Sequence, residues 1–122
     1  MMNEIQLGPL ESRFADMIWQ NEPVMSPELC RMALEELNWR KSTTYTVLRR
    51  LCDKGIFQNE KGEVTSLISR DDFYAARSRA FVRETFDGSL PAFIVAFAKD
   101  NKLGEEEVKA LRELVKQYEG GE

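Results

Sequence analysis

The stretch RKSTTYTVLRRLCDKG, residues 40–55, decides how the rest of the sequence is interpreted. Residues at the i, i+3, i+4, i+7 spacing of one helix face are apolar or β-branched: Thr44, Val47, Leu48 and Leu51. Gly55 follows them, and glycine is typical of the residue just beyond a helix. The stretch therefore predicts an amphipathic helix over about 41–54.

The opposite face of this helix combines short hydroxyl side chains with cations. Hydroxyl and β-branched residues are mediocre formers of a helix interior, so their number here needs a reason. Short side chains allow the helix start to approach phosphates and base edges closely, and arginine binds guanine or phosphate. An ordinary solvated face is the alternative. The candidate DNA contacts on this helix are Lys41, Ser42, Thr43, Tyr45, Thr46, Arg49 and Arg50.

Two further helices are predicted before this one, and a β-hairpin after it. Ser26 followed by Pro27 is typical of the start of a helix, and Gly62 supplies the conformational freedom that a hairpin turn needs. Three helices followed by a hairpin is the order of a winged helix-turn-helix domain. Lys61 at the hairpin tip is an eighth candidate DNA contact. The predicted segments are helices at about 10–20, 26–37 and 41–54, and strands at 56–58 and 64–68.

The remaining sequence predicts three more helices, at about 69–86, 90–99 and 105–118. Their apolar faces exceed what a small winged domain can cover, and an exposed helix of this kind favours association. We expect a winged helix domain over 1–69 and helical dimerisation over 70–122, in a mostly α fold with a small β-hairpin. The candidate dimer residues are Phe81, Phe93, Ile94, Phe97, Leu111 and Val115.

Composition argues against an enzyme. The 122 residues include no histidine, which removes Ser-His and Cys-His pairs and the commonest metal ligand. The two cysteines, Cys30 and Cys52, are far apart and are expected to be reduced thiols in helices. We therefore expect no catalytic residues, no metal and no cofactor. The start of the chain resembles no signal peptide, and no segment is apolar enough to insert into a membrane. These features favour a cytoplasmic protein.

Charge is distributed unevenly along the chain. The whole chain has a net charge of −4. Residues 38–61 nevertheless hold six basic and two acidic side chains, whereas residues 71–122 hold eight basic and eleven acidic ones. The positive charge is concentrated around the predicted third helix, which is where phosphate binding requires it.

Three segments resemble the penicillinase-repressor (BlaI/MecI) family of transcriptional regulators: SPELCRMALEEL at 26–37, NWRKSTTYTVLRRLCDKG at 38–55 and FVRETFDGSLPAFIVAFAK at 81–99. The likeness extends from about residue 7 to 118. It implies a homodimeric repressor whose winged helix binds palindromic operators in double-stranded DNA. It also implies a membrane-bound sensor metalloprotease as the upstream regulator, which cuts the repressor in its dimerisation region.

The chain departs from that family pattern at informative positions. Better-known members have a basic residue where Ser42 and Tyr45 stand, so their base preference is not transferred. The cleaved bond in β-lactam-responsive members is Asn-Phe, and the corresponding bond here is Ala96–Phe97, which keeps only the Phe. The tail lacks the Cys-x-Cys pair of copper-responsive relatives. Induction by cleavage within 90–102 and induction by an effector both remain open.

Two classes of function are therefore compared. A DNA-binding repressor is favoured by the order of elements, the local positive charge and the resemblance. A winged-helix module for protein–protein interaction, without specific DNA binding, is the alternative, and the net charge of −4 favours it. Salt-dependent binding to duplex DNA discriminates between them.

Overall fold

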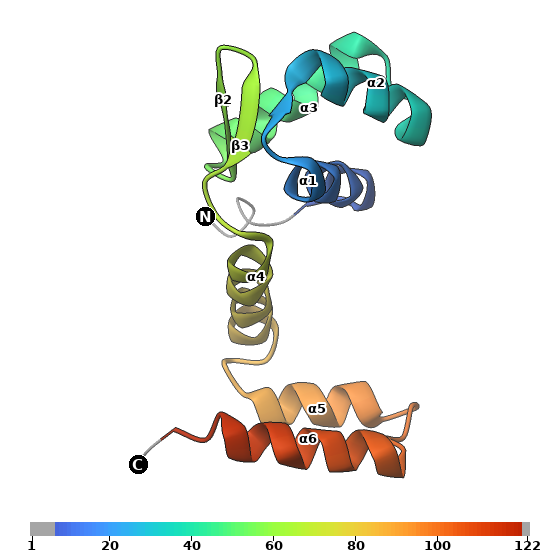
Figure 1. Ribbon diagram of the computed structural model, residues 1–122. Helices are drawn as coiled ribbons and strands as arrows, with labels where there is room; N and C mark the ends of the chain where they lie inside the picture. The colour runs from blue at the N-terminus through green and yellow to red at the C-terminus, as the bar shows by residue number, and fades with distance from the viewer. Residues whose placement is uncertain (1–6, 121–122) are drawn as a thin grey trace. The chain divides into compact units, whose positions relative to one another are not determined.

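The computed structural model describes residues 7–120, and within them it contains six helices and a small antiparallel sheet (Figure 1). The arrangement confirms the predicted fold class: a winged helix domain followed by C-terminal helices. In chain order the elements are α1 (Pro9–Asn21), β1 (Val24–Met25), α2 (Ser26–Leu37), α3 (Lys41–Asp53), β2 (Phe57–Glu60), β3 (Glu63–Ser66), α4 (Arg70–Thr85), α5 (Leu90–Ala98) and α6 (Glu105–Gln117).

The helix-turn-helix is formed by α2 and α3, with a left-handed residue between them. Asn38 has φ 58° and donates its backbone N–H to Leu34, while the N–H of Trp39 bonds to the carbonyl of Ala33. These bonds satisfy the last carbonyls of α2 and end the helix sharply. The short connection that follows leads directly into α3, as the helix-turn-helix order requires.

The sheet has one strand more than the sequence predicts. β1 pairs with β3, which also pairs with β2, in the order β1-β3-β2. Two residues are too few to show the alternation that identifies a strand, which is why β1 was not predicted. The pairing changes the start of α2 as well. Ser26 was expected to cap this helix, but Met25 takes the capping position and Ser26 begins the helix.

The wing hairpin is longer at its tip than expected, and its turn is tighter. The strand predicted at 56–58 runs to Glu60, and Glu60 lies opposite Glu63 in the register. Only Lys61 and Gly62 remain in the turn, with φ 54° and 95°. A two-residue hairpin turn with positive φ at both positions matches the twist of its strands, which accounts for the extension.

A single core holds the winged helix domain together. Phe14 and Ile18 of α1 are fully buried with Leu29 of α2, and the predicted core face of α3 joins them. Phe57 and Val64 add the inner face of the sheet. Leu37 at the end of α2 is half-buried. Each fully buried large apolar side chain contributes roughly 1.5–3 kcal/mol, so this core is a sufficient source of stability.

The first turns of α4 pack with the winged helix domain. Phe73 is buried, and its ring centroid lies 5.6 Å from that of Trp19, whose indole N–H donates to the carbonyl of Ile68. Arg70 pairs with Asp16 of α1 at 2.8 Å. The chain accordingly divides into a first compact unit that ends at Phe81 and a second that begins at Val82. The sequence had placed the boundary at 69/70, where the helical pattern begins.

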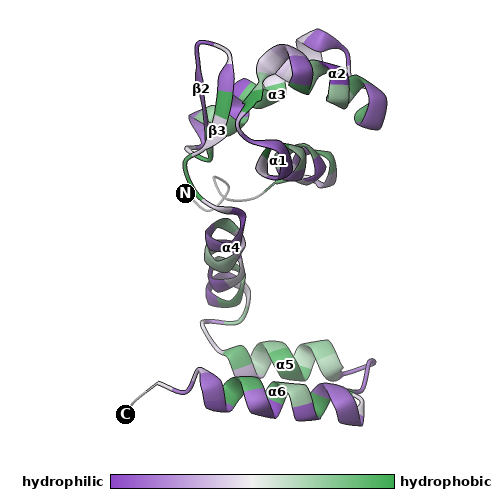
Figure 2. Ribbon diagram, in the orientation of Figure 1, coloured by the Kyte–Doolittle hydropathy of each residue, from purple (hydrophilic) through white to green (hydrophobic). Residues whose placement is uncertain are grey.

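The second unit contains the end of α4 together with α5 and α6, which run in opposite directions (Figure 1). Ser89 caps α5 by accepting a hydrogen bond from the N–H of Ala92 at 3.0 Å. Phe93 packs edge-on against Phe86 with ring centroids 5.6 Å apart. Hydropathy is high along the whole of α5 but alternates along α6 (Figure 2). Among the described residues, no helix is long and apolar enough to cross a membrane.

Candidate nucleic-acid interface

The two faces of α3 are divided as the sequence predicts. Its apolar side is buried against the core, at Thr44, Val47, Leu48 and Leu51. The Thr44 hydroxyl is satisfied within the helix, because it donates to the carbonyl of Arg40 at 3.2 Å. Ser42, Thr46 and Arg49 follow i, i+4, i+7 and lie along the middle of the exposed face. This line of two short hydroxyl side chains and one cation is exposed along its length.

The N-terminus of α3 suits an anion. Arg40 occupies the capping position, no side chain caps the helix, and the first turn contains no acidic residue. The first N–H groups of any helix lack partners within it and carry partial positive charge. Exposed Lys41 and Thr43 stand in the same turn. Backbone, hydroxyl and ammonium donors are thus gathered within one turn, which is a chemistry that phosphate binding uses.

Arg50 is directed toward α1 and away from the middle of this face. Its guanidinium lies 2.8 Å from a carboxylate oxygen of Glu11, whose other oxygen accepts the N–H of Gly8 at 3.1 Å. Burial alone would raise the pKa of Glu11, but the hydrogen bonds from Arg50 and Gly8 outweigh it, and the pKa is lowered from 4.5. The sequence analysis includes Arg50 among the candidate DNA contacts. The structure makes it a link between α3 and the start of α1.

Tyr45 lies on the other flank of α3, toward the wing. Its ring is half-buried against the core, and its hydroxyl donates to Ser26 Oγ at 3.1 Å. Beside it is an open hollow of about 280 Å³, lined by Tyr45, Leu48, Arg49, Cys52 and Asn59. Arg49 therefore stands between the exposed face of α3 and β2. The Tyr45 hydroxyl is already occupied as a donor, which the sequence gave no means of seeing.

The wing presents one cation at its tip. Lys61 is exposed in the two-residue turn, with Glu60 and Glu63 facing each other on the adjoining strands. The side-chain oxygen of Asn59 accepts the N–H of Gly62 at 2.9 Å and closes the turn. Lys61 is thus held on a short, ordered loop between two carboxylates, so its backbone position is defined although its side chain is free to extend.

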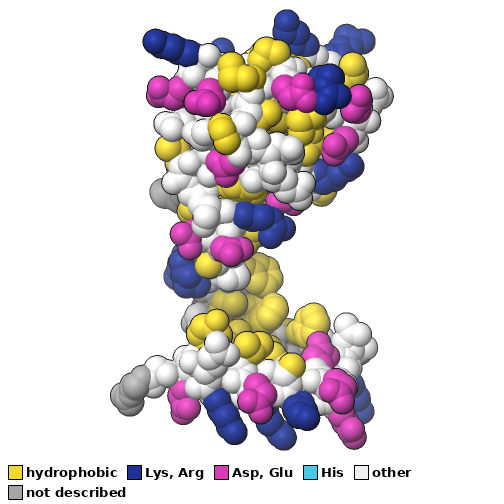
Figure 3. Space-filling view, viewed as in Figure 1, with side chains coloured by type: hydrophobic (Ala, Val, Ile, Leu, Met, Phe, Trp, Pro, Cys, Tyr) yellow, Lys and Arg dark blue, Asp and Glu magenta, His cyan; other side chains and the backbone are white. Residues whose placement is uncertain are grey.

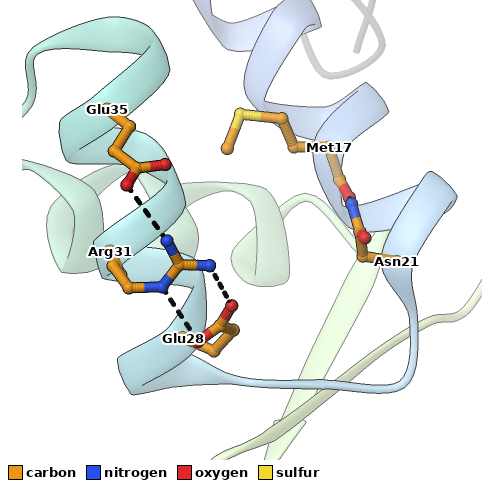
Figure 4. Close-up of polar contacts among 5 residues, drawn as sticks. All are labelled: Met17, Asn21, Glu28, Arg31 and Glu35. Atoms are coloured by element: carbon orange, nitrogen blue, oxygen red, sulfur yellow. Dashed lines mark hydrogen bonds and ion pairs between the residues drawn. The ribbon is translucent and has the colours of Figure 1, made fainter.

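On the exposed face of α2, acidic side chains outnumber basic ones, and the one basic side chain, Arg31, is paired with two of the acids. Arg31 bonds to both Glu28 and Glu35, which lie one turn before and one turn after it (Figure 4). The hydrogen bond from Arg31 lowers the pKa of Glu28. Figure 4 also shows the side chain of Asn21 donating to the carbonyl of Met17, at 2.8 Å, at the end of α1. Of α2, α3 and the wing hairpin, α3 is therefore the element with a net positive charge.

Neither cysteine forms a disulfide, and both are half-buried. Burial raises the pKa of the Cys52 thiol, and the neighbouring Asp53 adds to the effect. Over the described residues, no group of three His, Cys, Asp or Glu side chains could hold a metal ion. Cys52 lines the hollow beside Arg49 as a neutral thiol.

The candidate dimer residues are unevenly exposed. Phe93 and Ile94 are half-buried, whereas Phe81, Phe97 and Val115 are 50%, 49% and 64% exposed. Leu111 is also classed among the exposed large apolar residues. The candidate bond Ala96–Phe97 lies within α5, with both residues exposed. In Figure 3, hydrophobic side chains gather on the C-terminal helices and charged side chains line one edge of them.

Comparison with known proteins agrees with this arrangement. The sequence model of the family described as "Penicillinase repressor" matches residues 7–117. A penicillinase repressor of Bacillus licheniformis is 24% identical over 117 residues, covering 93% of this chain and 91% of that protein. A penicillinase repressor of Staphylococcus aureus is 22% identical over 116 residues, covering 92% of each. On the extent of the family match, the chain belongs to the penicillinase repressor family.

Proposed function

We propose that this protein is a transcriptional repressor that binds double-stranded DNA as a homodimer. The observation that carries the proposal is the exposed side of α3, where Ser42, Thr46 and Arg49 lie in line on a fully packed winged helix domain. A helix with short side chains and a cation on its outer face fits the major groove. The names of the family and of both relatives support the repressor function.

The residues divide into two proposed kinds of contact. Thr46 and Ser42 are short enough to reach base edges, and the threonine methyl group also suits a thymine methyl. Lys41, Arg49 and Lys61 are proposed to bind phosphates, which fix the register of the protein on the duplex. Arg50 contributes by holding α3 to α1 through Glu11. This division assigns sequence preference to the first two turns of α3.

The homodimer is proposed from the C-terminal unit. All residues of α5 and α6 are described, and none of them is buried. Nine apolar residues in succession, 90–98, leave α5 without a polar side to face water. A helix that is apolar on all sides is normally buried on all sides, and α6 can cover only one of them. A second copy would cover the rest, and two-fold symmetry would place two α3 helices on inverted half-sites.

Induction is proposed to act on the same unit. A cut within 90–102 would divide α5 or remove α6, and a monomer would lose the ~10²–10⁴ gain of binding two half-sites together. The family resemblance suggests a membrane-bound sensor metalloprotease as the agent. Ala96–Phe97 is helical, so cleavage there needs local opening, whereas charged residues 99–102 lie outside the helix. Persistence of the full-length band on an immunoblot after induction would instead favour an effector.

Selection from a random duplex pool tests the function. Full-length protein should enrich an inverted repeat whose half-site centres are about one helical turn of DNA, or a multiple of it, apart. A Thr46→Ala variant should retain binding but relax preference at one base pair of each half-site, at a cost of about 1–3 kcal/mol. If no sequence is enriched and no duplex is retained, the protein-interaction alternative is the better description.

A further inference from the structure

A series of hydrogen bonds connects α3 to the wing through the first residue of α2. The Tyr45 hydroxyl donates to Ser26 Oγ at 3.1 Å, and the N–H of Ser26 donates to the carbonyl of Gly62 at 2.7 Å. Gly62 belongs to the wing turn and directly follows Lys61. Ser26 is itself buried, with 6% of its surface exposed. One buried serine therefore holds α3 with its side chain and the wing turn with its backbone.

The wing turn packs closely against this serine. A Cβ atom placed on Gly62 would lie 3.3 Å from the terminal methyl of Met25 and 3.9 Å from Ser26 Oγ. Gly62 also has φ 95°, which L side chains rarely adopt. The absence of a side chain thus allows the turn to approach the β1–α2 junction. A displacement of Ser26 would pass directly to the backbone that carries Lys61.

We propose that Tyr45 is a positioning residue that sets the wing relative to α3, and that it does not read a base. Its half-buried ring and occupied hydroxyl support this role. A phosphate contact by Lys61 and base contacts by α3 can form together only if their separation is correct. The inference rests on the proposed function, because it describes how two parts of one DNA-binding surface are kept in register.

A double-variant cycle on the full-length protein tests the coupling. Tyr45→Phe removes the hydroxyl and keeps the ring, so affinity for the selected duplex should fall about 3- to 10-fold, the range of one net hydrogen bond. In a Lys61→Gln background the same change should have less than about a two-fold effect. Thr46→Ala is the matched control on α3, and its effect should be equal in both backgrounds. Equal effects of Tyr45→Phe in both backgrounds would overturn the proposal.

Amide hydrogen exchange of the free protein gives a measurement that needs no DNA. In Tyr45→Phe, the N–H of Ser26 should exchange several-fold faster, because its bond to Gly62 loses support from the side chain. Thr46→Ala should leave that rate unchanged. An unchanged Ser26 rate in Tyr45→Phe would overturn the coupling while leaving DNA binding intact. The exchange experiment does not test the proposed function. That function would be overturned if the wild-type chain retained no duplex.

Discussion

The first unit encloses a core of fully buried apolar side chains, whereas α5 and α6 of the second unit contain no buried residue. Up to Phe81 the chain surrounds fully buried aromatic and aliphatic residues, among them Phe14 and Phe57. Beyond Val82, α5 and α6 have no buried residue, and Val95 is 71% exposed. Both units are made of amphipathic or apolar helices. The difference is that the first contains enough elements to enclose its own core, whereas two helices cannot enclose one.

This contrast separates the sources of stability. We expect the first unit to be stabilised by its own packing and the second by association, so only the second should depend on protein concentration. The two tryptophans of the chain, Trp19 and Trp39, both belong to the first unit. Tryptophan emission therefore reports on the first unit alone, and the two units can be followed separately in one sample.

The largest expected effect is loss of the first core in Phe14→Ala. Phe14 is fully buried and its ring lies 5.2 Å from Trp39. Truncation of a buried phenylalanine costs about 3–5 kcal/mol, from lost burial and from the cavity left behind. Urea unfolding followed by tryptophan emission should show this loss at every protein concentration. A midpoint equal to that of wild type would mean that the first unit is not held by this core.

A smaller effect is expected for Phe97→Ala, which should weaken association without unfolding the first unit. Large-to-small changes in a packed interface cost about 2–5 kcal/mol. Because Phe97 is not fully enclosed within one chain, we expect at least a tenfold rise in the dimer Kd, measured by sedimentation equilibrium. The tryptophan unfolding midpoint of the monomeric variant should stay close to that of monomeric wild type. A dimer as tight as wild type would exclude Phe97 from the interface.

The two neighbouring arginines of α3, Arg49 and Arg50, are expected to affect the salt dependence of DNA binding differently. Arg49→Gln should make the slope of log affinity against log salt shallower by about 1.8, because the homodimer would release two fewer counterions, one for each protomer, at about 0.9 each. Arg50→Gln should leave that slope nearly unchanged, because its guanidinium bonds to Glu11. Both variants remove one charge from adjacent residues, so each is the control for the other. Equal reductions would indicate that Arg50 leaves Glu11 to bind phosphate.

The smallest effect concerns the pH dependence of the Glu11 pair. The pKa of Glu11 is lowered in the folded protein, so its contribution is complete above the ordinary value of 4.5 and is lost as the pH falls through the folded pKa. Arg50 is half-exposed, and such pairs contribute under about 1 kcal/mol. Glu11→Gln should be slightly less stable than wild type at pH 7, and the difference in stability should shrink as the pH falls below 4.5. A difference that persists in acid would argue against the ion pair as its cause.

The sequence predicts features that depend on near neighbours. Period and capping residues identify α3, and the buried face of Thr44, Val47, Leu48 and Leu51 is as expected. The hairpin is recognised from Gly62, although its turn is shorter than predicted. A helix start at Ser26 is also found, but the role of Ser26 differs because β1 pairs with β3 just before it.

Features that depend on distant pairs are not predicted. Glu11 and Arg50 are 39 residues apart, and Ser26 and Tyr45 are 19 apart, so no local pattern relates them. Each pair engages a candidate DNA contact of α3, Arg50 or Tyr45, with another part of the first unit. The packing of α4 with the first unit is not predicted for the same reason, because it depends on the contact between Phe73 and Trp19. Tertiary contacts, and not propensity, decide which cations of α3 are available to DNA.

We propose that the positive face of α3 on this acidic chain binds duplex DNA. The most direct measurement is the affinity of the full-length protein for its selected duplex as salt is raised from about 50 to 200 mM. We expect a steep linear decrease on a log–log plot, with a slope of about −0.9 for each phosphate neutralised, from Lys41, Arg49 and Lys61 of each protomer. An affinity that does not change with salt would show that α3 does not bind phosphates.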